Sequence, residues 1–240
     1  VVAEINKHQT YATGVYGQVA DLAHTGGKPL ISYQLTIGDQ PIDVASLPFR
    51  AEPATGFNVA LDGTQQLRLI HTDSASGFEL EIDYNFSPTM YLIDVSAQAR
   101  NIGDRPAKLL ISMGPNLAQT EVDSVDDSRH RKYVLNSTED GVRDVALTKV
   151  ETETVESGPF NWVAMRSKYF VAALIASNTN RMPFGGVLAK PVPGKGAHLT
   201  ATLLPANDGK FSFRLFVGPQ EPKQLEAIGH GFKDVNPFGW

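Results

Sequence analysis

Residues 158–176, GPFNWVAMRSKYFVAALIA, form the most strongly patterned stretch of the chain. The stretch contains Trp162, one of two tryptophans, and the longest uninterrupted apolar run, residues 169–176. Two apolar segments flank the polar residues 166–168, an interruption too short to form a helix. The pattern therefore predicts two core strands, residues 160–164 and 169–177, around a polar bend.

The apolar run is too short to cross a membrane. It has eight residues, whereas a spanning helix needs about 20. The amino terminus, VVAEINKHQT, also lacks the basic and apolar blocks of a signal peptide. We expect no membrane span in these residues, and an export signal would have to lie outside them.

Composition indicates one ordinary globular domain. The chain has 240 residues, of which 42% are hydrophobic and 20% charged, and β sandwiches of this length are common. A net charge of −5 disfavours nucleic acid and anionic lipid as main partners. The absence of cysteine excludes disulfides, thiolate zinc sites and cysteine nucleophiles.

Apolar and polar residues alternate in several segments, which is the pattern of half-buried strands. Turn residues at 101–106 and 207–209 each predict a hairpin between the flanking strands. Residues 121–144 carry mixed charge without apolar periodicity, which is typical of a solvated loop or edge. The predicted strands are residues 29–37, 42–47, 78–86, 91–99, 109–113, 142–148, 199–203 and 211–217.

Only the carboxyl end has helical spacing. Pro222 suits the first position of a helix, and Leu225, Ile228 and Phe232 make one apolar stripe. Gly229 and Gly231 weaken that helix. We expect a short helix near the end of an otherwise all-β chain.

No motif identifies catalytic chemistry. The six histidines show no metal-ligand spacing, and neither a GxSxG elbow nor a phosphate-binding loop is present. Asp123, Asp126 and Asp127 could bind a hard cation, but a solvated loop explains them better. We therefore expect no enzyme activity, no cofactor and no metal.

Two other functions fit a large sandwich. A mutarotase-like sugar epimerase would place Glu79 or Glu81 near His71 or His198 on one sheet face, although both glutamates also fit the solvated side of an amphipathic strand. A carbohydrate-binding module would expose aromatic side chains on one face. Candidates for that role are Tyr16, Tyr91 and Tyr133.

Four segments together resemble a known family. The strongest are NWVAMRSKYFVAALIA, residues 161–176, and FSFRLFVGPQEPKQLEAIGHGFKDVNPFGW, residues 211–240. Residues 77–113, with an N-x-G-x-x-P turn, and PLISYQLTIGDQPIDVASLPF, residues 29–49, are compatible. The chain from about residue 30 to residue 240 resembles the large periplasmic domain of bacterial YidC membrane protein insertases.

The resemblance implies a mainly all-β fold, a galactose-mutarotase-like β-supersandwich of two large antiparallel sheets with a short C-terminal helix. We expect an irregular lead-in or a partial first strand over residues 1–29, the sandwich over residues 30–220, and, within the same domain, the helix and exit toward the membrane over residues 221–240. The family's insertases insert and fold inner-membrane proteins, alone or with the Sec translocon. The implied location is the periplasmic face of the bacterial inner membrane, and we expect a monomer.

The resemblance also implies which residues matter. The domain would be a scaffold that contacts Sec translocon components and nascent membrane proteins through its helical end. Residues expected to be membrane-proximal or to contact a partner are Leu225, Ile228, Phe232, Phe238 and Trp240. Family-signature core residues are Trp162, Met165, Tyr169 and Phe170.

Overall fold

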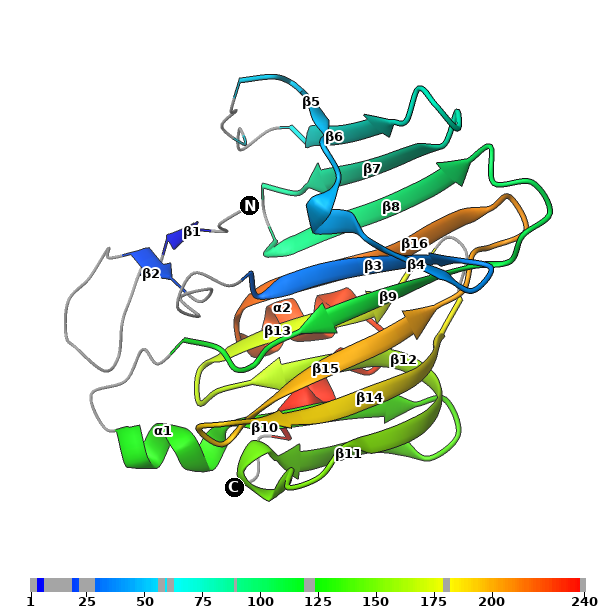
Figure 1. Ribbon diagram of the computed structural model, residues 1–240. Coiled ribbons are helices and arrows are strands. Elements are labelled where there is room, and N and C mark those ends of the chain that lie inside the picture. The colour runs from blue at the N-terminus through cyan, green and yellow to red at the C-terminus, as the bar shows by residue number, and fades with distance from the viewer. Residues whose placement is uncertain are drawn as a thin grey trace.

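The computed structural model describes residues 4–6, 19–21, 29–55, 59, 63–88, 90–118, 124–178 and 182–237. Its long antiparallel strands form two layers around a shared core, with a short helical segment against the outside of one layer (Figure 1). The predicted all-β sandwich with a short C-terminal helix is confirmed.

We refer to the two groups of strands as layer 1 and layer 2. Layer 1 contains, in spatial order, β4 (Gln40–Asp43), β3 (Ile31–Ile37), β9 (Ala107–Met113), β15 (Gly196–Leu203), β14 (Phe184–Val192) and the first half of β12 (Thr154–Arg166). Layer 2 contains β11 (Gly141–Ala146), β10 (Lys132–Ser137), the second half of β12, β13 (Phe170–Ala176), β16 (Lys210–Pro219), β8 (Leu92–Arg100), β7 (Glu79–Phe86), β6 (Gln65–Thr72) and β5 (Arg50–Glu52).

Shorter elements complete the described chain. Two short strands, β1 (Glu4–Asn6) and β2 (Val19–Asp21), pair with each other. The helices are α1 (Ser124–His130) and α2 (Pro222–Ile228), with 3₁₀ turns η1 (Val44–Ser46), η2 (Leu147–Lys149) and η3 (Phe232–Val235).

Strand β12 belongs to both layers. Its first half pairs with β14, its second half pairs with β13 and β10, and the register shifts between Ser157 and Phe160. Gly158 lies at this shift, where an added Cβ would come within 2.6 Å of the carbonyl oxygens of Phe184 and Gly185. Only glycine allows the backbones to approach so closely, and the strand can therefore pass from one layer to the other.

Residues 158–176, the stretch with the strongest sequence pattern, form the second part of β12 and all of β13. A turn that includes Ser167 joins the two strands. Successive side chains of a strand point to opposite faces. Phe170, Ala172 and Leu174 therefore face the core between the layers, while Val171, Ala173 and Ile175 face the helical segment outside layer 2. All of β13 is buried, which explains why its sequence is apolar at every position.

Both predicted hairpins are wrong. Strands β15 and β16 flank the turn near Asp208, but β15 pairs with β14 and β9, whereas β16 pairs with β13 and β8. Strands β8 and β9 also lie in different layers. The turn residues reverse the chain, but the two strands that flank each turn do not pair with each other, and their partners include distant strands, such as β9 for β15 and β8 for β16.

The region predicted as a solvated loop or edge holds more structure than expected. It contains α1, whose Asp126, Asp127, Arg129 and His130 suit the dipole at the two helix ends. It also contains β10, whose central residues, 133–136, are buried. The charges that flank these residues hid their apolar character, and the glycines and Pro191 hid β14 in the same way.

We predict that β13 is intolerant of truncation on both faces. Leu174→Ala and Ile175→Ala should each lower the free energy of unfolding by about 2–5 kcal/mol, because each leaves a cavity in a packed core. Leu204→Ala, at a side chain that is 50% exposed, is the control and should change stability by less than about 0.5 kcal/mol. Chemical denaturation measures all three, and a β13 variant as mild as the control would contradict two-sided burial.

Candidate functional site

The carboxyl end of the described chain packs against the outer face of layer 2. We call residues 222–235, which include α2 and η3, the C-terminal segment. Its four buried side chains, Leu225, Ile228, Phe232 and Val235, cover Val134, Trp162, Ala164, Val171, Ala173, Ile175 and Phe216. The C-terminal segment and the outer face of layer 2 therefore form one continuous apolar cluster.

Aromatic rings form the centre of this contact. The Phe232 ring lies edge-on to Trp162, with centroids 5.3 Å apart and an interplanar angle of 85°. It also lies 5.6 Å from the Phe216 ring. Edge-to-face pairs of this kind are favoured beyond the burial of their area.

Local sequence sets the path of the C-terminal segment. Pro222 begins α2, where its missing N–H is tolerated. Gly229 ends it with a φ of 82°, a conformation that glycine adopts without strain. This turn places Phe232 on η3 rather than on α2, so the predicted stripe of Leu225, Ile228 and Phe232 is divided between two helical turns.

Polar side chains of layer 2 hold the carbonyl groups at the end of α2. Arg214 Nη1 donates to the Ile228 carbonyl at 3.1 Å. Trp162 Nε1 and Asn136 Nδ2 donate to the His230 carbonyl at 3.0 and 3.2 Å. His230 Nε2 lies 2.7 Å from Asn178 Oδ1. We call Arg214, Trp162 and Asn136 the carbonyl anchors.

Arg214 is only 5% exposed, so its charge acts in a poorly solvated place. Burial lowers the pKa of Arg214, and the nearby Asp94 opposes that effect. A cation at the carboxyl end of a helix stabilises the helix through its dipole. The sequence offered one signal, a lone charge within the apolar strand FSFRLFV, and no signal for Asn136.

The structure separates the family-signature residues. Trp162 faces the C-terminal segment, whereas Met165 and Phe170 are buried in the core between the layers. Tyr169 lies at the margin of that core and is partly buried, with Lys168 Nζ 5.2 Å from its ring centroid. Phe238 and Trp240 lie outside the described residues.

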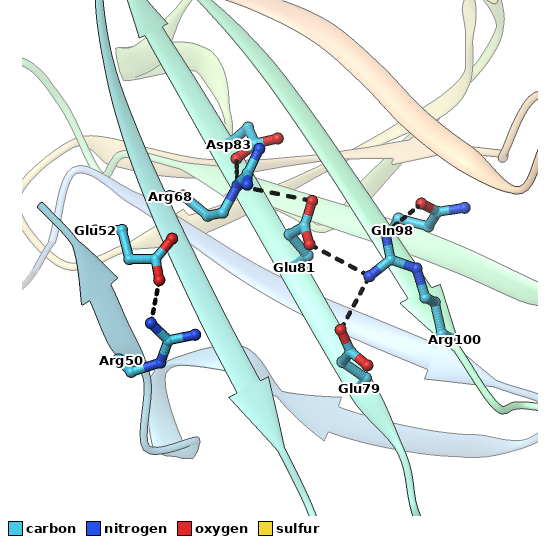
Figure 2. Close-up of polar contacts among 8 residues, drawn as sticks. All are labelled: Arg50, Glu52, Arg68, Glu79, Glu81, Asp83, Gln98 and Arg100. Atoms are coloured by element: carbon cyan, nitrogen blue, oxygen red, sulfur yellow. Dashed lines mark hydrogen bonds and ion pairs between the residues drawn. The ribbon is translucent and has the colours of Figure 1, made fainter.

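A charged surface covers the outer face of β6, β7 and β8 (Figure 2). Arg68 Nε lies 2.8 Å from Asp83 Oδ1, and Arg100 Nη1 lies 2.9 and 3.2 Å from carboxylate oxygens of Glu79 and Glu81. In each of these cross-strand pairs an arginine lies beside a carboxylate of opposite charge, which stabilises the pairing of the strands. The glutamates act as ion-pair partners.

The residues proposed for sugar epimerisation do not converge. His71 lies on the opposite face from Glu81, between Phe49 and Phe78, with Nδ1 3.0 Å from the Pro48 carbonyl. His198 lies on β15 in layer 1. These four residues form no acid–base pair.

Of the tyrosines considered for carbohydrate binding, Tyr133 and Tyr91 do not share an exposed face. Tyr133 is 2% exposed, and its hydroxyl donates to Glu156 Oε1 at 3.0 Å inside the sandwich. Tyr91 packs edge-on to Phe216. Tyr16 lies outside the described residues.

Asp126 and Asp127, two of the three aspartates considered for a cation, bind cationic side chains instead. Asp127 accepts from Arg131 Nε and Nη2, and Asp126 accepts from Lys168 Nζ at 2.7 Å. The Lys168 hydrogen bond lowers the pKa of Asp126. Asp123 lies outside the described residues, and within the described ranges no three metal-binding side chains gather.

The helices in the part of the chain that the structure describes include none with the length and apolar character needed to cross a membrane.

Comparison with known proteins shows the family. The model of the YidC periplasmic domain matches residues 19–240, nearly the whole chain. The chain belongs to the YidC periplasmic domain family. The match begins somewhat earlier than the resemblance noted from the sequence.

Curated relatives agree with this assignment. The chain is 26% identical over 194 residues to the membrane protein insertase YidC of Janthinobacterium sp. (strain Marseille), covering 75% of this chain and 33% of the relative. It is 24% identical over 229 residues to the insertase of Francisella tularensis subsp. holarctica (strain OSU18), covering 90% and 39%. The chain thus spans about a third to two fifths of the length of these two relatives.

Among solved structures, the chain resembles an α-N-acetylgalactosaminidase from Bifidobacterium bifidum in complex with GalNAc, with a TM-score of 0.56 and 12% identity. The match covers 82% of this chain and 32% of that enzyme. At this identity the likeness shows only that this YidC periplasmic domain shares a fold with the matched part of that enzyme.

We predict that the C-terminal segment contributes strongly to the stability of the domain. The double variant Ile228→Ala, Phe232→Ala should lose several kcal/mol, because each truncation of a buried side chain costs about 2–5 kcal/mol. Lys223→Ala, at an exposed position of α2, is the control and should behave like the unchanged chain. An unchanged unfolding midpoint in the double variant would show that the segment does not pack as described.

Tyr133 gives a second prediction, on alkaline stability. Burial, together with the Glu156 carboxylate, raises the pKa of Tyr133 to about 12, above the value of about 10 for an unfolded tyrosine. As pH rises through this range, the unfolded chain releases the proton while the folded chain retains it, so stability falls. Tyr133→Phe should show a shallower decline in unfolding free energy from about pH 10 to pH 12, and parallel curves would contradict the shift.

Proposed function

We propose that this chain is the periplasmic domain of a membrane protein insertase and works there as an interaction module. The family match over residues 19–240 supports the general role. The proposed location is the periplasmic face of a bacterial inner membrane. The proposed partners are Sec translocon components and nascent membrane proteins.

The observation that carries this proposal is the fixed position of the C-terminal segment. Four buried apolar side chains and the carbonyl anchors hold it against layer 2. A segment fixed in this way keeps one orientation relative to the sandwich, because movement would expose apolar surface and break the hydrogen bonds of the carbonyl anchors, of which the Arg214 bond is charge-assisted. Its outer face can therefore present contacts in a defined position.

The outer face of α2 is suited to partner contact. Lys223, Glu226 and Ala227 are exposed there, whereas Leu225 and Ile228 are turned toward the sheet. The glutamates of the charged surface are already paired with arginines, which favours an interaction role over acid–base catalysis.

Photo-crosslinking in the full-length insertase tests the proposal. A photoreactive residue at Lys223 or Ala227 should crosslink to Sec translocon components or to a nascent membrane protein during insertion. The matched control is Val155, which is 72% exposed on layer 1, away from the C-terminal segment. Crosslinks of equal yield at Val155, or none at α2, would count against the interaction module.

A further inference from the structure

The sandwich has several edge strands, and two of them are poorly suited to pairing with another chain. Strand β4 has four residues, including Pro41, which cannot donate a backbone hydrogen bond. Strand β5 has three residues and is followed directly by Pro53. Short edges and prolines are common protections against strand addition.

Strand β11 differs from these edges. It has six residues without proline and pairs only with β10 on one side, within the part of the chain that the structure describes. Residues 141–144 are exposed, and Val142 is 38% exposed. Figure 1 shows β11 as the outermost strand at the lower end of the molecule. Its free edge is long enough to accept another strand.

Ion pairs hold β11 in its extended form. Asp144 pairs with Lys132 on the neighbouring strand, and Arg166 Nη2 lies 3.8 Å from the same carboxylate. Arg143, on the other face of the strand, pairs with Glu156 of β12. A strand fixed in advance loses less conformational entropy when it binds a partner.

The charges of β11 also oppose pairing with a second copy of this chain. Antiparallel strands related by a twofold axis place one residue opposite its own copy. The two registers that pair most of β11 centre on Arg143 or on Asp144, and each puts like charges directly opposite. Such contacts are destabilising, so a different polypeptide is the better occupant.

We propose that the free edge of β11 binds an extended segment of another polypeptide by strand addition. In an antiparallel arrangement, an acidic residue of the partner lies opposite Arg143 and a basic residue lies opposite Asp144. Backbone hydrogen bonds supply affinity, and these charges select the sequence. The inference deepens the proposed role as an interaction module by naming a binding mode and the chemistry of the partner.

Two short peptides of identical composition test the proposal on the 240-residue chain. The matched peptide, acetyl-TVKEVT-amide, places glutamate opposite Arg143 and lysine opposite Asp144. The swapped peptide, acetyl-TVEKVT-amide, places like charges opposite. In NMR titrations the matched peptide should bind about tenfold more tightly, and hydrogen exchange should show protection within residues 141–146.

Neutral variants supply the controls. Arg143→Gln with Asp144→Asn should remove the difference between the two peptides, whereas Arg50→Gln with Glu52→Gln, which neutralises the ion pair on the β5 edge, should preserve it. Equal affinity of the peptides for the unchanged chain, no binding, or protection elsewhere would overturn the proposal, as would a dimer through β11 in sedimentation. None of these outcomes alters the crosslinking result expected at α2, so the two proposals can fail separately.

Discussion

Strand β13 is packed from both sides, and the rest of the structure depends on that arrangement. Its inward side chains complete the core between the layers, and its outward side chains form the surface under the C-terminal segment. Burial of apolar area contributes roughly 25 cal/mol for each Å². A polar residue on either face of β13 would lose its water without gaining a partner, so the sheet and the C-terminal segment constrain the same seven residues.

Polar contacts then determine where the C-terminal segment lies on this apolar surface. Hydrophobic contact alone has little directional preference, and a short helix could rotate or slide on it. The carbonyl anchors remove that freedom because hydrogen bonds require specific distances and angles. The position of Arg214 has an energetic cost, because two of its buried nitrogens have no hydrogen-bond partner among the described residues.

The sequence was most informative where one face of a strand is solvated. Alternation in β7 and β8 located both strands, because Leu80 and Ile82 are buried while Glu79 and Glu81 are on the charged surface. It was least informative about pairing, since the turn at Asp208 does not show that β15 pairs with β9 or that β16 pairs with β8. The carbonyl anchors were beyond prediction because they bind backbone groups brought close only by the fold.

The pairing of distant strands also constrains the order in which the molecule can assemble. Strand β16 pairs with β8, where Lys210 lies opposite Gln98. The same strand pairs with β13 on the side away from β12. The portion of layer 2 built from β5 to β8 therefore remains separate from β13 until β16 has been synthesised. Such non-local contacts slow folding, because a long chain segment must be closed before they form. An incomplete chain would expose the unpaired edges of β8 and β13. Such edges promote aggregation, so the chain is most in need of protection before β16 pairs with both strands.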